Sequence, residues 1–260
     1  MRSRRLPKPF LRHHPGGMYE RTERKRRIAT FIVAGLLVLA CGIWLRGLGT
    51  ASKQEVAVAQ EEVVRASIAK KTLRVGIQVG HLEAADLPAE LDKLSWNFGA
   101  SAGGVNEVDV NQDVADAAAV LLRNKGITVD VLPATIPTGY EADAFLTIHA
   151  DGNEDTSVSG YKTAGSFLDA NGKAAQLAAL VEESYGKATK MELDGVITED
   201  MTHYYAFNYI RFNHAVSPDT PAAILELGFI TNAADRKIMT RQTSAIANAI
   251  ASAILEFLGQ

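Results

Sequence analysis

The chain has 260 residues, 47% of them hydrophobic and 22% charged, with a formal net charge of −3. This composition is typical of a globular protein with one sizeable domain, and it excludes a disordered or low-complexity chain. Cys41 is the only cysteine, so a disulfide framework and a thiolate metal site are also excluded.

Charge and hydropathy set the N-terminal part of the chain apart. Residues 1–27 contain ten Lys/Arg and two Glu, whereas residues 28–45, IATFIVAGLLVLACGIWL, contain no charge. A charge-free run of this length is close to the minimum for a transmembrane helix, and the positive charges before it favour a cytoplasmic N-terminus. We therefore expect a basic cytoplasmic tail over 1–27, one membrane anchor over 28–45 and an extracytoplasmic remainder.

Two other interpretations of the apolar run remain open. A cleaved signal peptide needs a small-residue site close behind the run, and the nearest, AVA at 57–59, lies some distance away. A lipoprotein signal would use the sequence that ends in Cys41, although apolar residues continue beyond it. Residues 46–72 are mixed polar and small, which predicts a linker.

From Leu73 onward, short apolar strands alternate with helices. Strands are predicted over 73–79, 127–132, 144–149 and 222–226, and helices over 107–125, 173–188 and 243–258. This alternation predicts an α/β fold, a single three-layer domain over 73–260 with a mostly parallel twisted sheet flanked by helices. The polar stretch 82–105 is predicted to be a loop, and Asn106 is the expected N-cap of the helix that follows.

Three of the predicted strands lead into residues that can do chemistry. His81 follows the first strand closely, His149 ends the third and Glu226 ends the fourth. Functional residues in open α/β sheets gather beyond the carboxyl ends of the strands, so these three can share one crevice. A carboxylate embedded in the apolar segment AAILELGFI is costly to bury without a purpose, so Glu226 is the hardest to explain as a structural residue.

Two imidazoles and a carboxylate are a common ligand set for catalytic zinc, which keeps a further position open for water. His81 and His149 would supply the imidazoles. Glu107 is well placed as the third ligand because it lies in the first turn of the helix after the first strand, and Glu83 is the alternative. Glu226 then remains as a general base that deprotonates the water.

Each of these residues also has a structural interpretation. A histidine at a strand end is more often a hydrogen-bonded structural residue, and Glu107 would also complement the helix dipole. His203 and His214 are spare ligands in a polar, aromatic stretch that suits a substrate groove, whereas His13 and His14 fall in the basic tail. The outer part shows no phosphate-binding loop, nucleophile elbow or basic nucleic-acid patch.

Four segments between Leu73 and the C-terminus resemble the zinc-dependent N-acetylmuramoyl-L-alanine amidases that cleave bacterial peptidoglycan. They are, in chain order, VGIQVGH, NEVDVNQDVADAAAVLLRNKGITVDVL, ADAFLTIHAD and PAAILELGFITNAAD. The last is the most specific, and the shared order makes the resemblance strong. It implies that His81, Glu107 and His149 bind Zn²⁺ and that Glu226 is the catalytic carboxylate.

The sequence departs from this family pattern in three places. LEAADLPAELDKLSWNFGAS replaces the usual Gly-rich stretch after Gly-His, and PATIPTGYEADAF replaces a helix that usually precedes the second His. Thr147 and Asp151 stand where Ser and Asn are more common. No ligand is lost, but the expected shape of the substrate groove changes.

The resemblance implies hydrolysis of the amide between N-acetylmuramic acid and L-alanine. The expected anchor in the bacterial cell membrane, with the catalytic domain outside the cytoplasm, fits this substrate. Peptidoglycan is the implied partner, and Arg211 is a weak candidate for contacting a peptide carboxylate. Two alternatives remain, a zinc peptidase that cleaves the stem peptide and a catalytically silent wall-binding module. Because residues 1–27 carry a net charge of +8, the rest of the chain carries −11, which does not favour Coulombic attraction of the domain to an anionic wall. Loop 82–105 is long enough to cover the site.

Overall fold

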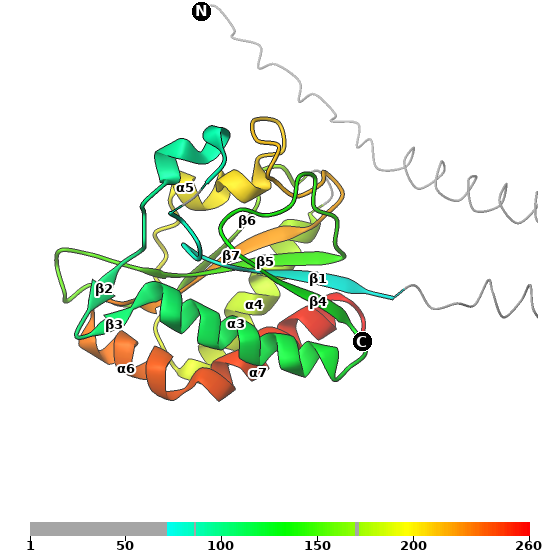
Figure 1. Ribbon diagram of the computed structural model, residues 1–260. Coiled ribbons are helices and arrows are strands. Elements are labelled where there is room, and N and C mark those ends of the chain that lie inside the picture. Colours follow the sequence, from blue (N-terminus) through cyan, green and yellow to red (C-terminus); the bar gives the residue numbers. More distant parts are fainter. Residues whose placement is uncertain (1–71, 86, 170–171) are drawn as a thin grey trace, which may run out of the picture. The chain divides into compact units, whose positions relative to one another are not determined.

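The computed structural model describes residues 72–85, 87–169 and 172–260 (Figure 1). The predicted basic tail, the predicted anchor and nearly all of the predicted linker lie outside these residues. No helix within the described ranges is long and apolar enough to cross a membrane. The described residues therefore correspond to the predicted domain.

A five-stranded sheet with the order β4-β1-β5-β7-β6 forms the centre of the domain. Its strands are β1 (Arg74–Val79), β4 (Thr128–Leu132), β5 (Ala144–Asp151), β6 (Lys162–Gly165) and β7 (Ala222–Phe229). The pairs β1–β4, β1–β5 and β5–β7 are parallel, and β6 runs antiparallel to β7. The mostly parallel sheet expected from the sequence is therefore confirmed.

Helices cover both faces of this sheet, the longer ones on one side (Figure 1). The longer helices are α3 (Glu107–Arg123), α4 (Lys173–Thr189), α6 (Ala233–Arg241) and α7 (Thr243–Phe257). The short elements are η1 (Ala89–Leu94), α5 (Glu199–Thr202) and η2 (Tyr205–Phe207), with a hairpin of β2 (Ser101–Ala102) and β3 (Val105–Asn106). The sheet flanked by helices is thus confirmed, with a thinner layer on the side of α5 and η2.

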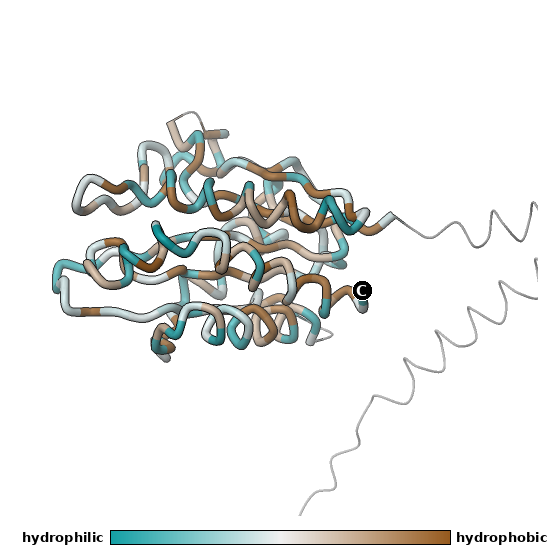
Figure 2. Tube along the Cα trace, turned by 90° about the horizontal axis from the view of Figure 1, so that it is seen from below, coloured by the Kyte–Doolittle hydropathy of each residue, from teal (hydrophilic) through white to brown (hydrophobic). Residues whose placement is uncertain are grey.

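The core consists of two hydrophobic clusters, one on each face of the sheet. Ile77, Leu146 and Leu225 are fully buried in the cluster that includes residues of α3, α4 and α7. Phe145 and Ile224, one position away along the same strands, belong to the other cluster. Side chains alternate between faces along a strand, so strands buried on both sides read as continuous apolar runs. Figure 2 shows the hydrophobic residues as brown segments that alternate with white and teal ones along the chain.

The structure corrects where two predicted strands end. β5 and β7 continue past His149 and Glu226 to Asp151 and Phe229, so neither residue ends its strand. His149 and Glu226 are register partners within the parallel ladder, and the register shifts only beyond His149. The residues that follow are themselves mostly buried and apolar, which lets the pairing continue.

The segment predicted to be a loop over 82–105 contains local structure. Helix η1 and strand β2 lie within it, and β3 begins at its end. Asn106 does occupy the N-cap position of α3, but its side chain makes no capping bond to the backbone. Instead its amide donates to the carboxylate of Asp109 at 2.9 Å.

Candidate functional site

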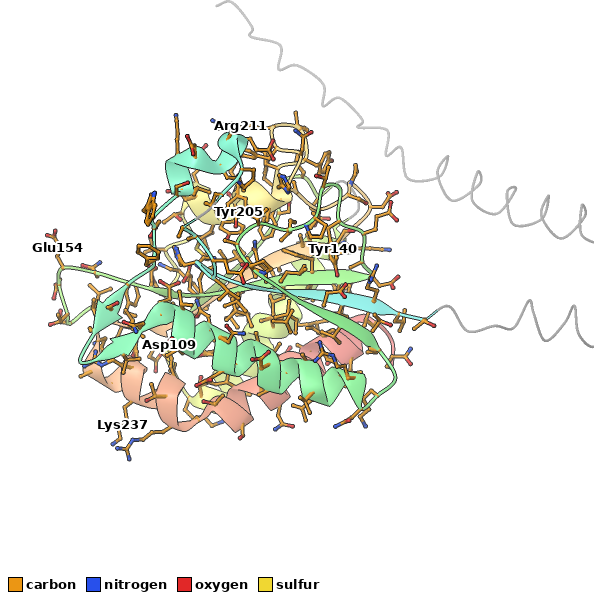
Figure 3. All side chains as sticks on the ribbon, viewed as in Figure 1. Asp109, Tyr140, Glu154, Tyr205, Arg211 and Lys237 are labelled. Carbon is orange, nitrogen blue, oxygen red and sulfur yellow. The ribbon has the colours of Figure 1, made fainter. Side chains whose placement is uncertain are left out.

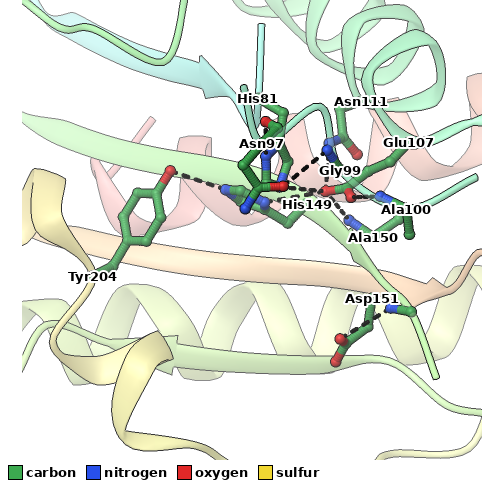
Figure 4. Close-up of polar contacts among 11 residues, drawn as sticks. His81, Asn97, Gly99, Ala100, Glu107, Asn111, His149, Ala150, Asp151 and Tyr204 are labelled. Atoms are coloured by element: carbon green, nitrogen blue, oxygen red, sulfur yellow. Dashed lines mark hydrogen bonds and ion pairs between the residues drawn. The ribbon is translucent and has the colours of Figure 1, made fainter. Parts of the chain in front are cut away.

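The side chains of His81, Glu107 and His149 come together near the carboxyl ends of the inner strands β1 and β5 (Figure 4). Each offers one ligand atom, and these atoms lie within 4.8 Å of one another. His81 Nε2 is 3.4 Å and His149 Nδ1 is 3.1 Å from Glu107 Oε1. Two ligands about 2.1 Å from a tetrahedral zinc ion stand about 3.4 Å apart, so this spacing fits a single ion.

Local backbone features place these three side chains. His81 follows β1 after one glycine and has a φ of 63°, in the left-handed region that non-glycine residues seldom adopt. A side chain at Gly80 would collide with the ring of His149, so glycine lets the two histidines approach. Glu107 is the first residue of α3 and is only 3% exposed. The cluster is thus built from a strand exit, a helix start and a strand interior.

The outward ring nitrogen of each histidine has a partner. His81 Nδ1 lies 2.8 Å from the carbonyl oxygen of Asn97, which can only accept, so Nδ1 carries the proton and Nε2 is free to ligate. His149 Nε2 lies 3.0 Å from the hydroxyl of Tyr204, which can accept a hydrogen bond from Nε2–H, so that Nδ1 is left for ligation. Metal-binding histidines usually donate their other N–H in this way, so both side chains fit a metal site.

Both oxygens of Glu107 accept hydrogen bonds. The backbone amide of Ala100 donates to Oε2 at 2.8 Å. The backbone amide of Ala150 and the side-chain amide of Asn111 donate to Oε1 at 3.1 and 3.3 Å. Burial opposes ionisation, but the hydrogen bond and charge of His149 and the other contacts outweigh it, so the pKa of Glu107 is below its usual value. An ionised carboxylate with a fixed orientation is what ligation requires.

Glu226 lies beside the cluster as the register partner of His149 on the neighbouring strand. Its Oε2 is buried and has no hydrogen-bond partner among the described residues. Burial raises the pKa of Glu226 to about 7, the carboxylates of Asp151 and Glu107 add to this, and the charges of His149 and Lys162 oppose it. A carboxyl group that titrates near neutral pH and keeps a free oxygen is suited to proton transfer.

The raised pKa gives a testable effect on the stability of the metal-free protein. The carboxyl of Glu226 has a pKa of about 7 in the fold against an ordinary 4.5, so the native state keeps a proton that the unfolded chain loses. The resulting stabilisation is complete at low pH and is lost as the pH rises through about 7. A Glu226→Gln variant, which never ionises there, should therefore gain stability over the unmodified chain as the pH rises.

The size of this gain follows from the shift in pKa. Relative to the unmodified chain, we expect Glu226→Gln to gain up to about 3 kcal/mol in free energy of unfolding between about pH 5 and pH 8. Urea unfolding at each pH in the presence of EDTA would measure this difference in free energy of unfolding. The contributions of the other titrating groups are similar in the two proteins, so they largely cancel. A difference between variant and unmodified chain that does not change with pH would contradict the assignment.

The structure does not bring the alternative ligands to the cluster. Glu83 is exposed. The ring of His203 stacks on Phe167 with centroids 3.8 Å apart, and Nδ1 of His214 lies 2.7 Å from the carbonyl oxygen of Ile136. Glu107 is therefore the carboxylate that the geometry favours as the third ligand.

Arg211 lies on the surface of the domain (Figure 3). Its guanidinium stands 5.1 Å from the ring of Phe212 in a cation–π contact. No described contact links it to the cluster, so its role in substrate binding stays a prediction.

Sequence reasoning missed several residues around the site. Asn97 and Tyr204 orient the histidines, and only the aromatic stretch THYYAF hinted at Tyr204. Lys162, the register partner of Glu226 on β6, is 5% exposed, and its ammonium lies 2.7 and 3.0 Å from the carboxylates of Asp151 and Asp194. Apart from that hint, the spacing of residues in the sequence does not indicate that Asn97, Tyr204 and Lys162 lie beside the site.

Comparisons with known proteins identify the family of this domain. The family model described as N-acetylmuramoyl-L-alanine amidase matches residues 75–256. Among solved structures, N-acetylmuramoyl-L-alanine amidase AmiC2 of Nostoc punctiforme is 19% identical with a TM-score of 0.52, over 72% of this chain and 98% of that chain. The CwlD amidase of Clostridioides difficile, in complex with the GerS lipoprotein, is 16% identical with a TM-score of 0.56, over 72% and 99%.

A third similar structure is the amidase Ami1 of Mycobacterium smegmatis, 17% identical with a TM-score of 0.54, over 72% of this chain and 97% of that chain. At these identities the structures show a shared fold alone. A sequence comparison with curated proteins finds no match. The family match is the stronger finding, because it spans most of the chain and includes all three ligand candidates and Glu226. The chain therefore belongs to the N-acetylmuramoyl-L-alanine amidase family.

Proposed function

We propose that this amidase hydrolyses the bond between N-acetylmuramic acid and L-alanine in peptidoglycan, with Zn²⁺ held by His81, Glu107 and His149. The observation that carries the proposal is the convergence of these three side chains beside Glu226. Two imidazoles and one carboxylate, without a thiolate, suit zinc in a catalytic site. The two ring nitrogens that point away from the cluster are already partnered, which supports metal binding over a purely structural role.

The reaction needs a base for water and an acid for the leaving nitrogen. Zinc held at this site would supply Lewis acidity that polarises the amide carbonyl and makes water a better nucleophile. Glu226 accepts a proton from the attacking water through its unpartnered oxygen. Glu226 then donates this proton to the nitrogen of L-alanine, which leaves as a free amine. The glycan strand keeps the lactyl carboxylate.

We also propose that the catalytic domain works outside the cytoplasm, anchored to the bacterial cell membrane by residues 28–45. The charge-free run after ten Lys/Arg supports this topology. Peptidoglycan lies on the same side of the membrane as the domain would in that topology. The linker 46–72 would then set how far the site reaches from the membrane.

Product analysis tests the proposed reaction. The full chain, loaded with zinc, would be incubated with purified peptidoglycan and the released fragments identified by mass spectrometry. Stem peptides with a new free L-alanine amine are expected. Cleavage within the stem peptide would instead identify a peptidase, and the absence of any release despite bound zinc would identify a silent wall-binding module or a covered site.

Tyr204 gives a sharper test of the metal site because its hydroxyl contacts the ring nitrogen of His149 that points away from the cluster. Tyr204→Phe keeps the ring, which packs edge-on to His149 with centroids 5.3 Å apart, and removes the hydroxyl. Loss of such an outer partner weakens metal binding about 10- to 100-fold. Competition with a zinc chelator would measure the change.

The matched control is Tyr140→Phe. The hydroxyl of Tyr140 donates to the carboxylate of Asp130 at 2.6 Å, and no described contact joins it to the cluster or to Tyr204. We expect its loss to leave zinc affinity within a factor of about three, because no ligand depends on it. Equal zinc affinities in both variants would contradict a role for Tyr204 in orienting His149.

A further inference from the structure

The segment between His81 and Glu107 exposes two aromatic side chains. Trp96 is 69% and Phe98 is 53% exposed. Their rings stand edge to face, with centroids 6.0 Å apart and an interplanar angle of 81°. By contrast, the exposed ring of Phe167 is covered on one face by His203. Trp96 and Phe98, called here the aromatic pair, have no such cover among the described residues.

The aromatic pair lies directly beside the candidate metal site. Its two members flank Asn97, whose carbonyl oxygen is the 2.8 Å partner of His81 Nδ1. The next residue, Gly99, runs so close to Glu107 that a side chain there would collide with the carboxylate. Figure 4 shows Asn97 and Gly99 next to the two ligands. The aromatic pair is therefore carried by the backbone segment that contacts two of the three ligand candidates.

The segment that carries the aromatic pair is held in place by long-range contacts. The carboxylate of Glu90 accepts bonds from the backbone amides of Asn213 and His214 at 3.1 and 2.8 Å. The amide of Trp96 donates to the carbonyl oxygen of Ala84 at 2.9 Å. The two rings are thus presented on a fixed piece of backbone rather than on a loose loop.

This arrangement carries a local cost. Trp96 has a φ of 65°, in a region that bulky residues rarely adopt. Its side chain is also left in water, where it gains little from burial. A residue that breaks local rules for backbone and burial at once is expected at a functional position, because the fold alone gains nothing from it.

Charge indicates which part of peptidoglycan the aromatic pair would contact. Residues 72–260 contain 12 Lys/Arg and 25 Asp/Glu, a formal net charge of −13. Stem peptides carry free carboxylates, which this domain repels. The sugars of an uncut strand are uncharged, because the muramic carboxyl group is tied up in the amide. Aromatic rings pack well against the C–H faces of such neutral rings.

We propose that Trp96 and Phe98 form a binding platform for a sugar ring of the glycan strand, next to the amide to be cleaved. The proposal rests on the proposed amidase function and names the part of the substrate that this surface recognises. It also assigns a function to residues 82–101, which replace the Gly-rich segment of the family. Recognition by stacking lets an acidic domain hold a polymer that it does not attract by charge.

Fluorescence gives a direct readout because the chain has 2 tryptophans, Trp44 and Trp96. A full-length Trp44→Phe variant leaves Trp96 as the only reporter. Titration with glycan strands freed of stem peptides should give a saturable change in its emission. Isolated stem peptides and anionic lipid vesicles, at the same concentrations, should not.

Calorimetry on the full chain then measures the contribution of each ring. We expect Trp96→Ala and Phe98→Ala each to weaken glycan binding about tenfold or more, as loss of an aromatic anchor does. Val120→Ala is the matched control, since Val120 is an equally exposed apolar residue, 53% exposed, on α3. Unchanged thermal unfolding of the Phe98 variant would show that lost binding is not lost folding.

The outcomes separate this proposal from the proposed reaction. Glycan affinity that is undetectable, or equal in all variants, would overturn the platform, as would binding of stem peptides or vesicles that depends on Trp96. If peptidoglycan is cleaved at the expected amide but the variants bind glycan normally, the platform fails and the amidase stands. If glycan binding depends on both rings but no L-alanine amine is released, the platform stands and the reaction fails.

Discussion

Glu226→Gln is expected to lower kcat for release of stem peptides by about 10²- to 10⁴-fold, the usual effect of removing a general acid–base group. Glutamine keeps the size of the side chain but can neither take the proton from water nor return it to the nitrogen. The measurement is the initial rate of new L-alanine amines from peptidoglycan at saturating substrate. Because both proton transfers use the same carboxyl group, no rescue by higher pH is expected.

The same variant should keep its metal. Glu226 is the register partner of His149 but is not among the three ligand candidates, so zinc affinity should stay within a factor of about ten. Glu154→Gln is the matched control, since Glu154 lies exposed in the loop after β5 (Figure 3), and its activity should be unchanged. If Glu226→Gln lost both zinc and activity, Glu226 would be a ligand rather than a base.

Most of the sheet could be predicted because its strands are buried on both faces and read as apolar runs. Strand β6, KTAG, could not, because it has no apolar or β-branched run and becomes a strand only through pairing with β7. The local structure of 82–105 was also missed. That segment is polar, and its position depends on contacts with distant residues such as the bonds from Asn213 and His214 to Glu90.

The site was predictable to the extent that topology determines it. Residues near the carboxyl ends of neighbouring parallel strands meet at one edge of the sheet, which is why His81 and His149 could be paired across the sequence. Spacing alone left Glu83 and Glu107 open as the third ligand. The structure favours Glu107, because the start of α3 places its carboxylate between the two imidazoles, whereas Glu83 is exposed.

The partners of the histidines were beyond sequence reasoning for a physical reason. Asn97 contacts His81 through its backbone carbonyl, an atom that every residue has, so residue type gives no signal. Tyr204 reaches His149 across 55 positions of sequence from the start of η2. Such contacts follow from the path of the chain after folding, which local patterns do not encode.

His149→Ala is expected to remove stoichiometric zinc and, with it, amidase activity. One of three protein ligands is lost, so zinc affinity should fall by more than the roughly 100-fold that loss of an outer partner causes. In the unmodified chain, zinc at about 100 times its dissociation constant should add about 2.7 kcal/mol to the free energy of unfolding, because only the native state assembles the site. The variant should show no such gain in thermal or urea unfolding.

The matched control for this loss is His203→Ala. His203 is exposed and stacks on Phe167 away from the cluster, so both zinc affinity and the zinc-dependent gain in stability should persist. A drop in zinc affinity for His203→Ala equal to that for His149→Ala would contradict the ligand assignment. If neither variant changed it, the cluster of His81, Glu107 and His149 would be a hydrogen-bonded structural site. Because unfolding is measured besides activity, a failed metal site and a failed amidase remain distinguishable.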